Sequence, residues 1–153
     1  MNEKWKEFLK AVEKKCPQTH IYTQPEECLI YSHGCYPREY KWILQGDYPY
    51  LTRAVVSPAD EAEISEIVKL ANEYEVGIIP YGGGSGIVGG TIPYQGEIMI
   101  NVKRLQDFSI NIVNGTARGG AGLTGAEFEN LLNEHGYTAV STHSLSRVHA
   151  LAE

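Results

Sequence analysis

The 153-residue sequence has no long hydrophobic run and no excess of positive charge. No stretch reaches the roughly 20 apolar residues of a membrane helix, and the charged N-terminus is unlike a signal peptide. The net charge of −6 differs from the basic balance typical of nucleic-acid-binding domains, so we expect no nucleic-acid partner and no membrane span. These absences predict a soluble, cytoplasmic protein with the length of one ordinary domain.

Cysteine is also scarce, because Cys16, Cys28 and Cys35 are the only three and form no Cys-x-x-Cys pair. This usage is typical of reduced thiols in a cytosol rather than of a disulfide framework. His20 and His33 lie near them in the sequence, but the spacings fit no zinc pattern, so we predict no metal site. None of the five histidines lies in a motif that marks a general base, and the catalytic residues are therefore unknown from the sequence.

Residues 77–96 contain no charged side chain but hold eight of the sixteen glycines. A short apolar run ends at Pro80, and residues 82–90 then read GGGSGIVGG. Because glycine loses the most backbone freedom on folding, such a cluster indicates that something must approach the backbone closely. A phosphate held by converging N–H groups is the usual ligand of such a loop. A flexible linker is the alternative interpretation, although a linker would contain more serine and charge.

The glycine pattern does not fit the commonest phosphate-binding motifs. No Gly-Lys-Ser/Thr follows, which excludes a P-loop. Gly84-x-Gly86-x-x-Gly89 matches the dinucleotide fingerprint, but that fingerprint opens a helix and the residues up to Pro93 do not favour one.

Helices and strands are predicted to alternate up to about Leu105. Apolar residues spaced i, i+3, i+4 and i+7 predict helices over 3–15 and between Asp60 and Gly77. The second helix begins with an Asp60–Glu63 capping box. Its predicted buried face consists of Ile64, Ile67, Val68 and Ala71. Strands are predicted at 21–22, 54–56, 78–79 and 98–102, and a helical turn at 25–29.

A second unit is predicted after Leu105. Asn114-Gly115 is a strong hairpin signal between strands at 108–113 and 116–118. Thr124 and Glu127 form a capping box that opens a helix, and Gly136 suits its C-terminal cap. The helix has an apolar stripe of Phe128, Leu131 and Leu132, and a further strand is predicted at 137–140.

Aromatic residues are dense between residues 31 and 50. They are Tyr31, Tyr36, Tyr40, Trp42, Tyr48 and Tyr50. They either line a ligand cavity or pack a loop-rich edge of the core, and we favour packing.

The order of these parts resembles FAD-linked oxidases. The resemblance is carried by Val55-Val56-Ser57-Pro58, a helix, Ile79-Pro80-Tyr81-Gly82-Gly83-Gly84-Ser85 and Gly89-Gly90. Ile100-Asn101-Val102-Lys103-Arg104-Leu105 and Gly120-Ala121-Gly122-Leu123-Thr124 agree with it. More narrowly, the sequence is similar to the FAD-binding (PCMH-type) domain of the vanillyl-alcohol oxidase and p-cresol methylhydroxylase superfamily. That superfamily includes glycolate oxidase subunits, D-lactate dehydrogenases and alkyldihydroxyacetonephosphate synthase.

The resemblance implies an α+β fold with a first β-α-β subdomain and an incomplete second subdomain. Residues 1–24 would form an N-terminal helix and lead-in, and residues 25–153 the N-terminal portion of the FAD-binding domain. Tyr31-Ser32-His33 lies where such proteins often have Tyr-Ser followed by an aspartate, and here the aspartate is replaced.

In such proteins the glycine loop wraps the FAD pyrophosphate with its backbone N–H groups. The implied cofactor-binding residues are Pro80, Tyr81, Gly82, Gly83, Gly84, Ser85, Gly86, Gly89 and Gly90. Ser85 would add a hydroxyl donor. The loop contains no histidine, so the implied FAD is non-covalent.

The implied function is the FAD-binding portion of a flavin-dependent oxidoreductase. Such enzymes act on a 2-hydroxy acid or a similar CH–OH substrate by hydride transfer to flavin. Relatives are much longer and carry a Thr-x-Gly-Gly motif where Ser141 to Leu145 stand here. The chain would supply this part alone or with a second polypeptide that completes the flavin domain. The alternatives are a truncated, non-catalytic fragment and a phosphate- or nucleotide-binding module.

Overall fold

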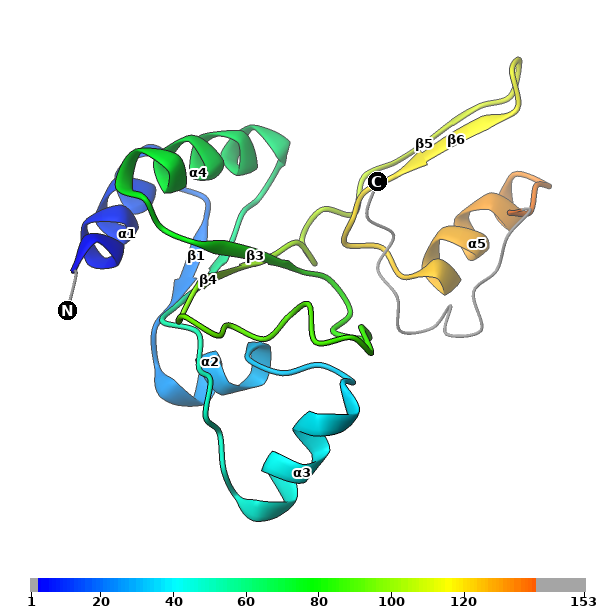
Figure 1. Ribbon diagram of the computed structural model, residues 1–153. Helices are drawn as coiled ribbons and strands as arrows, with labels where there is room; N and C mark the ends of the chain where they lie inside the picture. The colour runs from blue at the N-terminus through cyan, green and yellow to red at the C-terminus, as the bar shows by residue number, and fades with distance from the viewer. Residues whose placement is uncertain (1–2, 140–153) are drawn as a thin grey trace.

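A four-stranded sheet lies between helices in the computed structural model, which describes residues 3–139 (Figure 1). The strand order is β1 (His20–Tyr22), β2 (Val55–Ser57), β4 (Ile98–Asn101) and β3 (Ile78–Tyr81). β2 and β3 each pair with β4 in parallel, whereas β1 is antiparallel to β2. The chain leaves β2, forms α4 (Glu61–Tyr74) and returns as β3, which confirms the predicted β-α-β unit.

The two faces of this sheet pack against different helices (Figure 1). On one face, α1 (Lys4–Lys15) and α4 bury Phe8, Val12 and Ile67 against Val56 and other strand residues. The opposite face carries a smaller cluster of Val55, Tyr81 and Met99, and Tyr31 packs against it. Neighbouring residues of one strand face opposite sides, so the continuous apolar runs of β2 and β4 fill both clusters.

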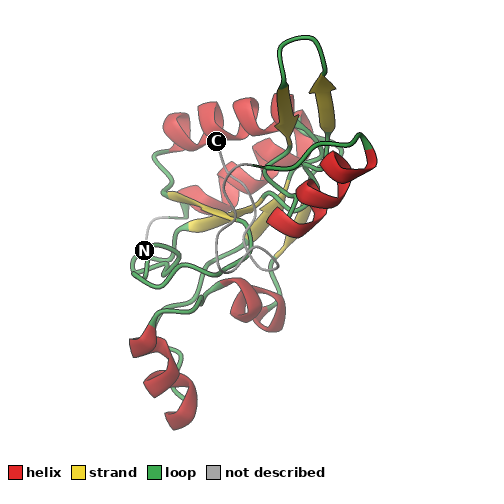
Figure 2. Ribbon diagram, turned by 90° about the vertical axis from the view of Figure 1, so that its right-hand side faces the viewer, coloured by secondary structure: helices red, strands yellow, loops and turns green. Residues whose placement is uncertain are grey.

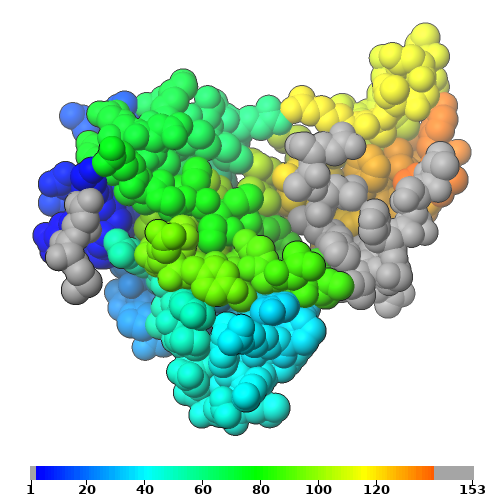
Figure 3. Space-filling model, viewed as in Figure 1, coloured from blue at the N-terminus to red at the C-terminus, as the bar shows by residue number. Residues whose placement is uncertain are grey.

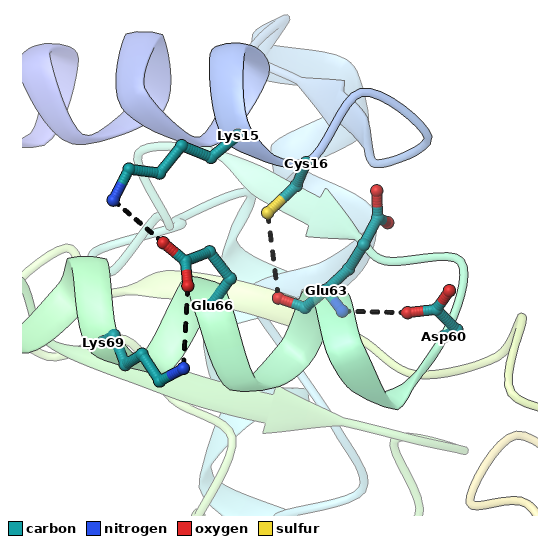
Figure 4. Close-up of polar contacts among 6 residues, drawn as sticks. All are labelled: Lys15, Cys16, Asp60, Glu63, Glu66 and Lys69. Carbon is teal, nitrogen blue, oxygen red and sulfur yellow. Dashed lines mark hydrogen bonds and ion pairs between the residues drawn. The ribbon is translucent and has the colours of Figure 1, made fainter.

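α1 and α4 are also tied by polar contacts, which Figure 4 shows. The Lys15 ammonium lies 2.9 Å from the Glu66 carboxylate, which also pairs with Lys69 at 3.7 Å. The Cys16 thiol lies 3.9 Å from the carbonyl oxygen of Glu63. Exposed ion pairs of this kind contribute little to the free energy of folding. The buried apolar face accounts for most of the stability of this helix pair.

The start of α4 differs in part from the predicted capping box. Asp60 accepts a 2.8 Å hydrogen bond from the Glu63 N–H, which confirms it as the N-cap (Figure 4). The Glu63 carboxylate does not return to Asp60. It accepts hydrogen bonds from the N–H groups of Gln18 and Ala59 and from the Thr19 hydroxyl. These donors outnumber the one that a capping box offers, so Glu63 links the α1–β1 turn to α4.

The buried face of α4 is rotated slightly from the predicted one. Ile67, Leu70 and Ala71 are buried, whereas Val68 is 38% exposed, so its predicted burial was wrong. Both Val68 and Leu70 flank the Ile67–Ala71 stripe, and the position of α1 decides which one is covered.

Two helices lie on the other side of the sheet. The helical turn predicted at 25–29 is α2 (Pro25–Tyr31), and α3 (Pro37–Gln45) was not predicted. Gly46 ends α3 in the left-handed conformation, with φ +67°.

The second unit consists of a two-stranded hairpin and one helix. β5 (Phe108–Asn111) pairs antiparallel with β6 (Thr116–Gly119), and the hairpin extends away from the larger sheet (Figure 2). α5 (Gly125–Glu134) has the predicted Thr124–Glu127 capping box. Residues 137–139 are not in a strand, so that part of the prediction was wrong. Val140 lies outside the described residues. Within residues 3–139, none of the helices has the length and apolar character needed to span a bilayer.

Candidate cofactor-binding site

The glycine loop starts where parallel strands end. β3 ends at Tyr81, which pairs with Asn101 at the end of β4. Gly82 and Lys103 therefore both lie beyond the carboxyl ends of the strands, at the same end of the sheet. In α/β sheets, ligands bind outside the carboxyl ends of parallel strands, which makes this end the first place to look for a site.

Residues 82–90 form bends and irregular backbone with no helix, as predicted. Gly84 and Gly89 have φ of +67° and +77°, which side-chain-bearing residues rarely adopt. A Cβ added to Gly84 would lie 2.2 Å from the Tyr81 hydroxyl oxygen. At Gly86 a Cβ would meet nothing within 4 Å. Glycine is thus required sterically at Gly84, whereas Gly86 is open to its surroundings.

The backbone donors of this loop are unused within the described part of the chain. None of the N–H groups from Gly82 to Thr91 donates a hydrogen bond to a residue in 3–139. The first N–H after them that does so belongs to Ile92, which donates to Gly89. A run of free N–H groups is the donor set that a phosphate needs, so the loop fits a pyrophosphate.

The segment after α2 forms hydrogen bonds with the glycine loop and with Tyr81. The Cys35 N–H donates to the Gly86 carbonyl at 3.3 Å, and the Tyr81 hydroxyl donates to the His33 carbonyl at 3.2 Å. The Gly34 N–H donates to the buried Glu39 carboxylate at 2.7 Å. The loop is therefore held by its carbonyls and by Tyr81, which leaves its N–H groups available.

Three predicted site residues lie in or under this scaffold. Pro80 is in β3, the edge strand, where its missing N–H is tolerated. Tyr81 is buried in the smaller core cluster, and Ser85 is 8% exposed. Figure 3 shows the light green chain that follows β3 on the front surface, above the cyan segment that contains α3. Ile87 and Val88, which belong to this loop, are exposed.

Gly82 and Gly83 line an open hollow together with the start of α5. Its volume is about 180 Å³, whereas one water needs about 10–15 Å³, so it admits a group much larger than water. The other lining residues are Lys103, Gln106, Gly122, Thr124 and Glu127. None of these five residues was predicted as a site residue. Lys103 follows β4, and only the parallel pairing of β4 with β3 brings it to the glycine loop.

The second unit reaches the hollow through a close backbone contact. The Gly122 N–H donates to the Leu105 carbonyl at 2.7 Å, and the Gly120 N–H donates to the Asp107 carbonyl at 2.7 Å. A Cβ at Gly122 would lie 2.5 Å from the Val102 carbonyl oxygen. These glycines allow the turn before α5 to lie directly on the chain that leaves β4.

The pKa values of Tyr31, Tyr81 and Glu127, near the hollow, are shifted in ways that keep each in one protonation state at physiological pH. Burial raises the pKa of the Tyr31 and Tyr81 phenols, which keeps both neutral at physiological pH. Hydrogen bonds from the Thr124 N–H and hydroxyl lower the pKa of the Glu127 carboxyl, which stays ionised.

Aromatic side chains of residues 31–50 pack against neighbouring rings and do not line a large cavity. Tyr50 contacts both Trp42 and Tyr94 edge-to-face, with ring centroids 5.5 Å and 4.8 Å apart. The cavity beside Trp42, Tyr50 and Glu39 measures about 20 Å³, which is room for one or two waters. Across residues 3–139, no group of three or more His, Cys, Asp and Glu is arranged to hold a metal ion.

Several known proteins are similar to this chain in sequence or in fold. The D-lactate dehydrogenase of Archaeoglobus fulgidus is 32% identical over 82 residues, which cover 54% of this chain and 18% of that enzyme. The Bacillus subtilis glycolate oxidase subunit GlcD is 32% identical over 90 residues, 58% of this chain and 17% of that subunit. A structure of alkyldihydroxyacetonephosphate synthase superposes with a TM-score of 0.76 and 26% identity, covering 85% of this chain and 26% of that one.

The chain spans less than a fifth of the length of these two sequence relatives. Residues 52–150 match the family described as FAD binding domain, and this match includes the glycine loop, β4 and α5. The free N–H groups of the loop fit the phosphates of that cofactor. The chain therefore belongs to the FAD binding domain family.

Proposed function

We propose that this chain binds FAD non-covalently and forms the cofactor-binding part of an oxidoreductase. The observation that carries the proposal lies at the carboxyl ends of β3 and β4, where the N–H groups from Gly82 to Thr91 donate to no residue in 3–139. These groups would hold the phosphate oxygens, and Gly84 allows the backbone to turn them outward. No histidine lies in the loop, which supports non-covalent binding.

We also propose a 2-hydroxy acid as the substrate of the complete enzyme. The support is that the relatives include a D-lactate dehydrogenase and a glycolate oxidase subunit. A bound FAD supplies the hydride acceptor, and this chain supplies binding and orientation. The chain spans under a fifth of those relatives. We also propose, as a partner, a second polypeptide that completes the flavin domain.

The binding proposal is tested by following flavin fluorescence anisotropy while the 153-residue protein is added to FAD or to riboflavin. Riboflavin lacks the phosphates, so we expect FAD to bind more tightly and ADP to compete with it. Equal binding of FAD and riboflavin would contradict a phosphate site in the loop. Binding of ADP without FAD would instead support a general nucleotide-binding module.

The substrate proposal needs the complex in its native form. The protein is purified from its native source together with any partner chain that it binds. It is then loaded with FAD under anaerobic conditions and mixed with D-lactate or glycolate. Loss of the oxidised flavin absorbance with a 2-hydroxy acid, but not with a simple primary alcohol, is the expected result. Equal reduction by both substrates would overturn the substrate proposal without affecting the cofactor proposal.

A further inference from the structure

Among the described residues that line the hollow beside Gly82 and Gly83, Lys103 is the only cationic one. It lies two residues beyond the end of β4, at the edge of the sheet where the glycine loop begins. The hollow also contains the Glu127 carboxylate, so a phosphate placed there would meet one positive and one negative side chain.

The surrounding side chains fix where Lys103 lies. Its ammonium nitrogen is 5.6 Å from the centroid of the Tyr31 ring and 5.7 Å from that of Tyr81. The two rings meet edge-to-face at 5.2 Å. Asn101, which is 6% exposed, donates to the Tyr31 hydroxyl and accepts from the Lys103 N–H. One buried amide therefore positions both the lysine backbone and an aromatic ring beneath its side chain.

The charge of Lys103 is not neutralised within the described chain. No carboxylate in residues 3–139 forms an ion pair with it. Glu127 is engaged in the α5 capping box, where it accepts from the Thr124 N–H at 2.7 Å and from the Thr124 hydroxyl at 2.8 Å. The two phenol rings offer cation–π attraction, which is weaker than pairing with an anion when the site is exposed.

Resting on the proposed function, we propose that the Lys103 ammonium contacts the FAD phosphates and supplies the positive charge of the site. The loop N–H groups are neutral donors, so they orient phosphate oxygens without balancing their charge. Lys103 offsets the repulsion that Glu127 exerts on a bound phosphate. The ligand chemistry it recognises is the phosphate-bearing part shared by FAD and ADP, and riboflavin lacks it.

The test compares Lys103→Gln, Lys103→Arg and a matched control, Lys14→Gln, which removes one exposed charge from α1. Dissociation constants for FAD, ADP and riboflavin are measured by calorimetry at low and high salt. We expect Lys103→Gln to weaken FAD and ADP by about three- to tenfold and to reduce the salt dependence of their binding. Lys103→Arg and Lys14→Gln should stay within about twofold of the unmodified protein, and riboflavin should not respond.

The outcomes separate this inference from the proposed function. If the unmodified protein binds FAD and Lys103→Gln binds it equally well, only the role of Lys103 is overturned. If Lys103→Gln loses riboflavin and ADP to the same extent, the lysine acts through folding and not through phosphate. If the unmodified protein binds neither FAD nor ADP, both the proposed function and this inference fail.

Discussion

Gly84 and Gly115 have the same φ of +67° but different surroundings. A Cβ at Gly84 would lie 2.2 Å from the Tyr81 hydroxyl, whereas a Cβ at Gly115 in the hairpin turn would meet nothing within 4 Å. The two positions therefore separate the cost of a left-handed backbone from the cost of a steric clash.

We predict that Gly115→Ala lowers the free energy of unfolding by about 1 kcal/mol, the cost of the left-handed backbone. Gly84→Ala should cost about 1–3 kcal/mol more because the methyl group displaces Tyr81. Urea unfolding measures both values. FAD binding should be lost in Gly84→Ala and retained in Gly115→Ala. Equal stability of the two variants would show that Tyr81 does not constrain the loop.

At the residue scale, the sequence identified the loop but not the direction of its side chains. Tyr81 was predicted among the cofactor-binding residues because of its place in the motif, and the structure buries its side chain below the loop. Lys103 escaped prediction because no local pattern marks it. Its place in the site depends on the parallel pairing of β4 with β3, which is a long-range contact.

At the scale of elements, Glu63 links α4 to the turn after α1. Burial pushes the pKa of Glu63 upward, but hydrogen bonds from Ala59, Thr19 and Gln18 outweigh it, and the pKa falls below its ordinary value of 4.5. The unfolded chain therefore takes up the proton first as the pH falls. The contribution of Glu63 to stability is complete above about pH 4.5 and is lost below it.

This linkage predicts a smaller acid sensitivity in Glu63→Gln. The variant cannot take up the proton, so its urea midpoint should fall less between about pH 6 and about pH 3 than that of the unmodified protein. Glu13→Gln, an exposed change on α1, serves as the control and should keep the original pH dependence. A parallel decline of all three midpoints would exclude Glu63 as an acid-labile contact.

The turn before α5 offers a second prediction at this scale. In Gly122→Ala the methyl group would lie 2.5 Å from the Val102 carbonyl oxygen, so α5 must shift away from β4. We expect the amide protons of α5 to exchange faster, because the free energy of local unfolding of α5 should fall by about 1–3 kcal/mol. Gly90→Ala, which meets nothing within 4 Å, is the control. Unchanged exchange in α5 would mean that the helix does not depend on this contact.

The helices α1 and α4 were predicted from apolar residues at i, i+3, i+4 and i+7, which the structure largely buries. α3 was missed although Tyr40, Ile43 and Leu44 have part of the same spacing. Tyr40 and Leu44 are exposed, and the buried residue of α3 is the charged Glu39. Pro37 at its start and Gly46 at its end also marked that helix. The burial of Leu70 in place of Val68 likewise depends on α1, which no pattern within α4 can reveal.

At the scale of the whole molecule, both units line the hollow beside Gly82 and Gly83. The sheet unit contributes the glycine loop and Lys103, and the second unit contributes the turn and first residues of α5. The chain spans less than a fifth of the D-lactate dehydrogenase and the glycolate oxidase subunit that it resembles. We propose that phosphate binds to the N–H groups of residues 82–90, which donate to no residue in 3–139.

The most direct test is to observe those N–H groups by nuclear magnetic resonance while FAD or ADP is added to the ¹⁵N-labelled protein. We predict that the signals of residues 82–90, Lys103 and Gly122 move with both ligands. The signals of Gly115 in the hairpin turn and Gly46 after α3 should stay in place. Shifts confined to other parts of the chain, or a loop that does not respond at the highest FAD concentration, would contradict the account.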